Sequence, residues 1–176
     1  MLRIALGIIL VAAASTLGDY IWYEFGVRHR AIVGVLHGAL LLMAVGGVIG
    51  NAAGRTIAGL FMGAAAGIGG ALAYYALAPV AGGVAMVAAW VIVWLLLAIG
   101  EGRLLQRVRR GWPDVLARGM LAAVLSGIAF AAVLGLLWGR PPQGERSYLL
   151  QFAAWTIAWA PGLLAIVIGG RRDRAT

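Results

Sequence analysis

The sequence predicts an all-α polytopic membrane protein, a bundle of six transmembrane helices with both ends in the cytoplasm. Of its 176 residues, 63% are hydrophobic and 11% are charged, whereas a soluble domain carries about 25% charged residues. The apolar residues form long runs instead of periodic stripes, and the arginines collect in alternate connecting segments. The length allows a single transmembrane domain that covers 1–176.

Each predicted span is an apolar run of about 20 residues, the length that crosses a hydrocarbon core of about 30 Å. The first run also resembles a signal peptide, because one Arg precedes an apolar stretch that ends in small residues. The stretch continues into Tyr20, Trp22 and Tyr23, which are typical of an interfacial belt, so an uncleaved helix is preferred. The six predicted spans are about 2–23, 31–50, 57–78, 84–100, 116–138 and 148–169.

Arginine positions predict the orientation, because cytoplasmic loops of membrane proteins are enriched in Arg and Lys. With the N-terminus inside, the outer loops hold Arg28, Arg30, Arg140 and Arg146. The cytoplasmic segments then hold the larger set: Arg3, Arg55, Arg103, Arg107, Arg109, Arg110, Arg118, Arg171, Arg172 and Arg174. We therefore expect a multi-pass protein of a prokaryotic cytoplasmic membrane, with both ends inside.

The basic cytoplasmic segments predict partners among membrane lipids and none among nucleic acids, since the spans leave no soluble face. In the segment 101–114, Leu104, Leu105 and Val108 recur at helical spacing. Two interpretations stay open: an interfacial helix that Trp112 and Pro113 end, or a frayed helix end with snorkelling arginines. Anionic lipid heads are expected at Arg103, Arg107, Arg109, Arg110, Arg171 and Arg172.

Small residues predict how the helices pack, because helices in lipid associate by close packing and buried polar contacts. Gly59, Gly63 and Gly67 recur every four residues along the third span, and Gly46 and Gly50 form a similar patch on the second. We expect these two spans to pack as a tight hairpin. The alternative is that the stripe of the third span contacts a second copy of the chain and makes a homo-oligomer.

Pro161 lies in the middle of the sixth span, where a proline removes a backbone hydrogen bond and predicts a kink. The freed carbonyl group of Ile157 is able to bind a polar ligand or an ion. The other interpretation is that Thr156 or a neighbouring helix satisfies the backbone and nothing binds there.

Charged residues within spans are costly and are therefore functional candidates. Asp19 lies about 8 Å below one side of the turn at 24–30, and His37 lies about 10 Å below the other side, at about 1.5 Å per residue. Antiparallel helices would bring the two side chains to similar depth. An Asp19–His37 pair is thus a candidate for a ligand site, a proton relay or a helix contact, with Trp22, Glu24 and His29 nearby.

No catalytic residue, metal site or cofactor is assigned from the sequence. The chain has no Cys, and Asp19, Glu24, His29 and His37 do not have the spacing of metal ligands. No nucleophile elbow, phosphate loop or dinucleotide fingerprint occurs. Two pairs of tryptophans one turn apart either face a hydrophobic cavity or serve packing: Trp90 with Trp94, and Trp155 with Trp159.

The preferred functional interpretation is a membrane protein that binds a lipid or another small hydrophobic molecule, or acts as a scaffold. Short loops, few polar residues within the spans and glycine-mediated packing favour it. One alternative is a small transporter or channel that uses Asp19 and His37 in the outer half. A second alternative is a membrane enzyme that works at the outer face.

Overall fold

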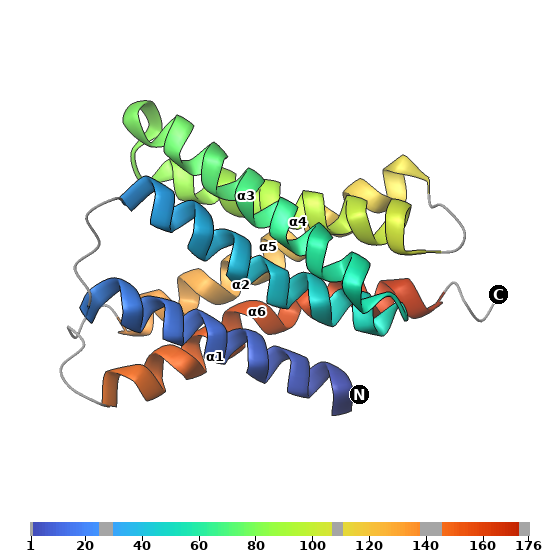
Figure 1. Cartoon of the computed structure of the whole chain (residues 1–176), viewed down its shortest axis with the longest axis horizontal. Coiled ribbons are helices and arrows are strands. Elements are labelled where there is room, and N and C mark those ends of the chain that lie inside the picture. Colours follow the sequence, from blue (N-terminus) through green and yellow to red (C-terminus); the bar gives the residue numbers. More distant parts are fainter. Residues whose placement is uncertain (1, 25–29, 107–110, 138–145, 173–176) are drawn as a thin grey trace.

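A computed structural model of the chain describes residues 2–24, 30–106, 111–137 and 146–172, which form helices and their connections (Figure 1). The prediction of an all-helical protein with six apolar spans is confirmed, since six helices are long and apolar enough to cross a membrane. In chain order the elements are α1 (Leu2–Glu24), α2 (Arg30–Ala52), α3 (Thr56–Ala81), α4 (Val84–Gly100), the π-helix η1 (Glu101–Leu105), α5 (Trp112–Leu137) and α6 (Arg146–Arg172).

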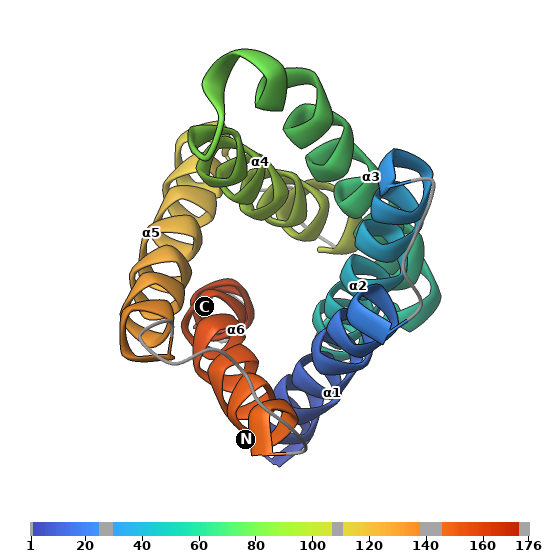
Figure 2. The ribbon, with the colours of Figure 1, turned by 90° about the vertical axis from the view of Figure 1, so that its left-hand side faces the viewer.

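The helices follow one another around a ring, and α6 completes the ring between α5 and α1 (Figure 2). The start of α1 and the end of α6 lie at the same end of the bundle (Figure 1). The turn between α2 and α3 lies at this end too, and the turn between α3 and α4 lies at the opposite end. An even number of spans produces this arrangement, because each span reverses the direction of the chain.

Glycines form the two tight turns that join α2 to α3 and α3 to α4. Gly54 and Gly82 have φ angles of 74° and 52°, a region that residues with a Cβ rarely adopt. The N–H group of Gly82 donates to the carbonyl oxygen of Ala78 at 3.0 Å and closes the last turn of α3. This helix therefore extends to Ala81, beyond the predicted end before Pro79.

The glycine stripes of α2 and α3 face each other at backbone contact. A Cβ on Gly50 would come within 2.7 Å of the Cα of Gly59, and a Cβ on Gly63 would lie 2.9 Å from the Cα of Gly46 and clash with the carbonyl oxygen of Leu42. A Cβ on Gly67 would clash in the same way with the carbonyl oxygen of Gly38. The stripe of α3 is thus used within the chain, on the face that packs against α2.

The segment after α4 differs from the interfacial helix that the sequence allowed. Residues 101–105 continue α4 as a π-helix, in which the N–H of Gln106 donates to the carbonyl oxygen of Glu101 at 3.2 Å. Trp112 and Pro113 do not end a helix but begin α5, where a proline in the first turn has no hydrogen bond to lose. The expectation about Val108 lies outside the described residues.

Candidate functional site

Two hydrogen bonds join α1 to α6 inside the bundle. The indole Nε1 of Trp155 donates to the carboxylate Oδ2 of Asp19 at 2.7 Å, and that of Trp159 donates to the hydroxyl of Ser15 at 3.0 Å. Ser15 in turn donates to the carbonyl oxygen of Val11 at 2.9 Å. Ser15 and Asp19 are one turn apart on α1, and Trp155 and Trp159 are one turn apart on α6. Because the two helices are antiparallel, their side chains meet at two successive turns.

His37 of α2 approaches α1 at the residue next to Asp19. Its ring lies against Gly18, where a Cβ would come within 2.5 Å of Nδ1 and 3.0 Å of Nε2. Asp19 and His37 are close enough to interact electrostatically. Among the residues described, however, the hydrogen bond of Asp19 goes to Trp155 and not to His37.

The indole of Trp155 is also part of a continuous group of rings, here called the aromatic cluster. Neighbouring ring centroids are 5.0 to 6.3 Å apart, the range of favourable aromatic contacts. Trp94 and Trp159 are fully buried within it. The aromatic cluster consists of Trp90 and Trp94 from α4, Phe130 from α5, and Trp155 and Trp159 from α6.

Among the described residues, three buried polar atoms in or near this cluster have no hydrogen-bond partner: Nε1 of Trp90, Nε1 of Trp94 and Oε1 of Gln151. Gln151 lies one turn before Trp155 on α6, and Trp94 packs on Gly162, beside Pro161. Unpartnered buried donors and acceptors are unusual in native proteins and cost free energy. The region around Trp155 thus combines apolar surface with unused hydrogen-bonding capacity.

The helix α6 continues through Pro161. Thr156 donates its hydroxyl to the carbonyl oxygen of Phe152 at 2.7 Å. This hydrogen bond is therefore not made to the carbonyl group of Ile157. The hydroxyl of Ser126, on α5, donates to the carbonyl oxygen of Ala158. The neighbouring helix α5 therefore makes a polar contact with the carbonyl group of Ala158. The carbonyl group of Ile157, one residue earlier, is the one that Pro161 leaves without its helical donor.

A second polar group, which was not predicted from the sequence, lies at the opposite end of the bundle. The carboxylate of Glu101 is buried, accepts a hydrogen bond from Gln106 and lies 3.8 Å from Nη1 of Arg118. Arg118 also pairs with Asp114 at 2.6 Å. The signal for this site was an acidic residue directly after an apolar run, followed by an arginine in the first turns of the next span.

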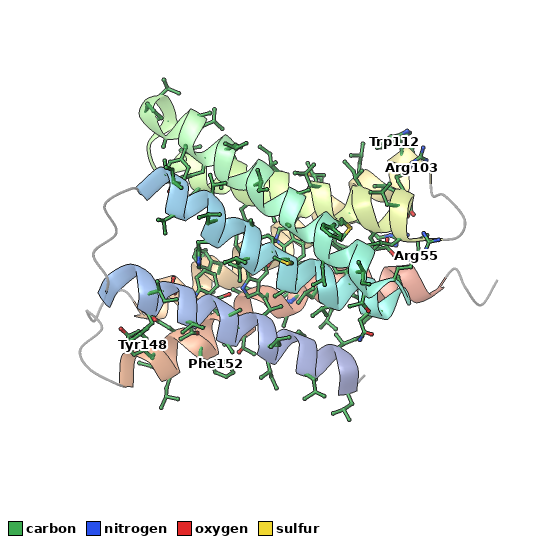
Figure 3. The ribbon with its side chains drawn as sticks, in the orientation of Figure 1. Arg55, Arg103, Trp112, Tyr148 and Phe152 are labelled. Atoms are coloured by element: carbon green, nitrogen blue, oxygen red, sulfur yellow. The ribbon has the colours of Figure 1, made fainter. Side chains whose placement is uncertain are left out.

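Arginines surround this second group. Nη1 of Arg55 donates to the carbonyl oxygen of Leu104 at 2.8 Å, and the guanidinium of Arg103 lies 4.7 Å from the ring centroid of Trp112. Figure 3 shows Arg55, Arg103 and Trp112 at one end of the molecule and Tyr148 at the other. Tyr148 packs edge-to-face with Tyr20 at 5.4 Å, in the seam between α1 and α6.

Several residues singled out from the sequence have side chains that the structure does not describe. His29, Arg107, Arg109 and Arg110 lie outside the described residues. Trp22 and Glu24 belong to the last turns of α1, and Arg171 and Arg172 to the end of α6, but their side chains are not described. In the part of the chain that the structure describes, no three His, Asp or Glu residues gather to hold a metal ion.

The fold defines a multi-pass integral membrane protein. No protein-family model matches the chain, and no curated protein or solved structure matches it either. A carboxylate, an imidazole and stacked indoles within a membrane suit a molecule with an apolar body and one polar or charged group.

Proposed function

We propose that this protein binds a small hydrophobic or amphipathic molecule beside Asp19, between α1 and α6. One observation carries the proposal. The indole of Trp155 donates to Asp19 and at the same time stacks on Phe130 and Trp159, with centroids 5.3 and 6.2 Å apart. The polar group and the aromatic surface are therefore continuous, which is the composition of sites that orient an apolar ligand by a few polar contacts.

A transporter is the second candidate, favoured by Asp19 and His37, two titratable side chains that interact within the membrane. The group around Glu101 lies toward the other end of the bundle. Between these two regions the described core is apolar, with Trp94, Leu97 and Leu163 fully buried. Because no polar path joins the two groups in the described core, binding is favoured over passage.

The test is native mass spectrometry of the protein released from lipid nanodiscs. We expect a retained small molecule on the wild-type protein and its loss from Asp19→Asn, which keeps the shape of the side chain and removes its charge. Asp114→Asn makes the same change at an exposed carboxylate and should retain the molecule. A wild-type protein without any adduct would argue against the binding function.

We also propose that the end of the bundle with both termini faces the cytoplasm and contacts anionic lipid heads. Arg55 and Arg103 lie at this end, and the positive-inside rule assigns such an end to the cytoplasm (Figure 3). Arg103 stacks on Trp112, a residue type that prefers the headgroup level. Lys and Arg near such a surface attract anionic lipids.

A further inference from the structure

We infer that the seam between α4 and α5 binds a neutral apolar molecule through one oxygen acceptor, the carbonyl oxygen of a ketone, an ester or a quinone. The recognising group is the indole N–H of Trp90, whose nitrogen is buried and has no hydrogen-bond partner among the described residues. Trp90 lies about 9 Å along α4 from Val84, at about 1.5 Å per residue. At that depth the hydrocarbon supplies no water, so an unused donor is costly.

Gly127 of α5 leaves a space directly beside this donor. Among the described residues, and apart from its own helix, a Cβ on Gly127 would have only Cδ1 and Nε1 of Trp90 within 4 Å, at 3.9 and 4.0 Å. On Gly119, two turns earlier, a Cβ would lie 2.9 Å from Leu95 and 3.1 Å from Ala98. The seam is therefore closely packed at Gly119 and has room for an additional atom at Gly127.

This space borders the lipid-facing surface of the bundle. Gly127 and Trp90 are both partly exposed. On α5, Ala131 lies one turn after Gly127 and Met120 two turns before it, and both are exposed; on α4, Val87 lies one turn before Trp90 and is exposed too. A molecule dissolved among the acyl chains would therefore direct its oxygen into the seam while its apolar body stays on this surface.

The described part of the protein offers Trp90 no acceptor of its own. The side chains of α4 carry no oxygen, and neither do those of α5 from Gly127 to Leu137. On α6, Oε1 of Gln151 is a buried acceptor, but it has no partner and so does not accept from Trp90. Trp94 has an unpartnered N–H as well, but it is fully buried. Trp90 is thus the donor that a molecule from the lipid reaches.

This site goes beyond the binding proposed at Asp19 and does not depend on it. Trp90 and Gly127 face each other across α4 and α5, whereas Asp19 lies between α1 and α6 (Figure 2). The oxygen has two possible sources with the same chemistry, the ester group of a phospholipid and a free small molecule. The experiment distinguishes these sources.

The experiment compares benzophenone with diphenylmethane, which has a similar shape and lacks the carbonyl oxygen. Each is titrated into protein with ¹⁵N-labelled indoles, in an uncharged maltoside detergent, and the indole N–H resonances are followed by NMR. Trp90→Phe identifies the resonance of Trp90. We expect benzophenone to move that resonance downfield in a saturable way, as a new hydrogen bond does. Diphenylmethane should bind about tenfold more weakly and cause no downfield shift.

Gly127→Ala fills the space with a methyl group that meets no atom closer than 3.9 Å, so the protein should fold and the benzophenone shift at Trp90 should disappear. Gly83→Ala adds the same methyl group where nothing lies within 4 Å, and should keep the shift. The comparison of the two probes requires no variant, so it remains decisive if Gly127→Ala does not fold.

Nanodiscs of diester or diether phospholipid, without a probe, identify the source. A downfield Trp90 resonance in the diester lipid alone would assign the acceptor to a lipid ester, and equal resonances in both would assign it to a free molecule. An equal effect of diphenylmethane, no response of Trp90, or full benzophenone binding by Gly127→Ala would overturn the inference. None of these results affects the test at Asp19, which uses a different seam and a different variant.

Discussion

At the scale of single residues, Trp155 has the largest number of roles in the candidate site. It donates to Asp19, stacks on Phe130 and Trp159, and joins α1 to α6. In the sequence it is one of seven tryptophans, and its spacing from Trp159 shows only that both lie on one side of a helix. Its role depends on the residue that faces it, which lies 136 positions away in the chain.

The Asp19–Trp155 hydrogen bond predicts energetic coupling between the two side chains. Asp19→Leu and Trp155→Phe should each lower the melting temperature in detergent, and the double variant should cost less than the sum. Cycles of this kind in a membrane protein give about 0.6 kcal/mol and at most about 1.7 kcal/mol. The control cycle pairs Asp19→Leu with His37→Gln and should show weaker coupling, because no hydrogen bond joins these side chains. Stronger coupling to His37 would contradict this assignment.

The contact between His37 and Gly18 predicts a background-dependent effect. In the wild-type protein, Gly18→Ala should destabilise by about 1–3 kcal/mol, the usual cost of overpacking, because its Cβ meets the His37 ring. In a His37→Ala protein the same change should be neutral or stabilise by up to about 1 kcal/mol, the helix preference of Ala over Gly. Thermal unfolding measures both. Gly83→Ala, which adds its Cβ in open space, is the control, and an equal loss in both backgrounds would exclude the contact as its cause.

At the scale of helices, the α2–α3 hairpin is where sequence spacing was most informative. Glycines every four residues lie on one side of a helix whatever surrounds it, so the stripe follows from helical geometry alone. Which partner occupies the stripe does not follow, and a second copy of the chain was an open alternative. The partner within the chain is α2, because the short turn at Gly54 holds the stripes of α2 and α3 side by side.

Substitutions on α3 should separate the face toward α2 from the face toward α4. Gly63→Ala places a Cβ against the backbone of Leu42, which cannot move without parting the two helices, so we expect a loss of about 2 kcal/mol or more. Gly69→Ala meets only the methyl tip of Leu96, at 2.9 Å, and should be tolerated. The yield of folded protein in size-exclusion chromatography and its melting temperature measure the difference. Similar behaviour of the two variants would show that the backbone contact is not critical.

The segment after α4 shows why periodicity alone could not choose between interpretations. Leu104 and Leu105 fit an interfacial helix and a frayed helix end equally well. The outcome depends on buried Glu101, on its pairing with Arg118 from α5, and on the hydrogen bond from Arg55 to Leu104. These contacts come from separate helices and are absent from any local pattern.

At the scale of the whole molecule, the six helices close into a ring through the contact of α1 with α6. The Asp19 site lies in this closing seam, so it exists only when the first and last helices have met. Both termini and the α2–α3 turn lie at one end. The orientation of that end in the membrane is open to a direct experiment.

Single cysteines measure the orientation, because the natural chain has no Cys to react in the background. Gly83→Cys lies in the exposed turn between α3 and α4, and Asn51→Cys lies at the exposed end of α2, at the other end of the bundle. With the termini in the cytoplasm, a membrane-impermeant maleimide should label Gly83→Cys in intact cells. It should label Asn51→Cys only after lysis. The opposite pattern would reverse the proposed orientation.

The sequence by itself determined the class of the protein, the number of spans and the glycine stripes, because length, hydropathy and helical spacing act within each segment. It also indicated Asp19 and His37 as costly groups in the membrane. Only the tertiary structure decided that Asp19 meets Trp155, that the rings of three helices form one cluster, and that Glu101 pairs with Arg118. The reason is that hydropathy sets where a helix lies but not how it is rotated. Rotation follows from packing against helices that are distant in the chain.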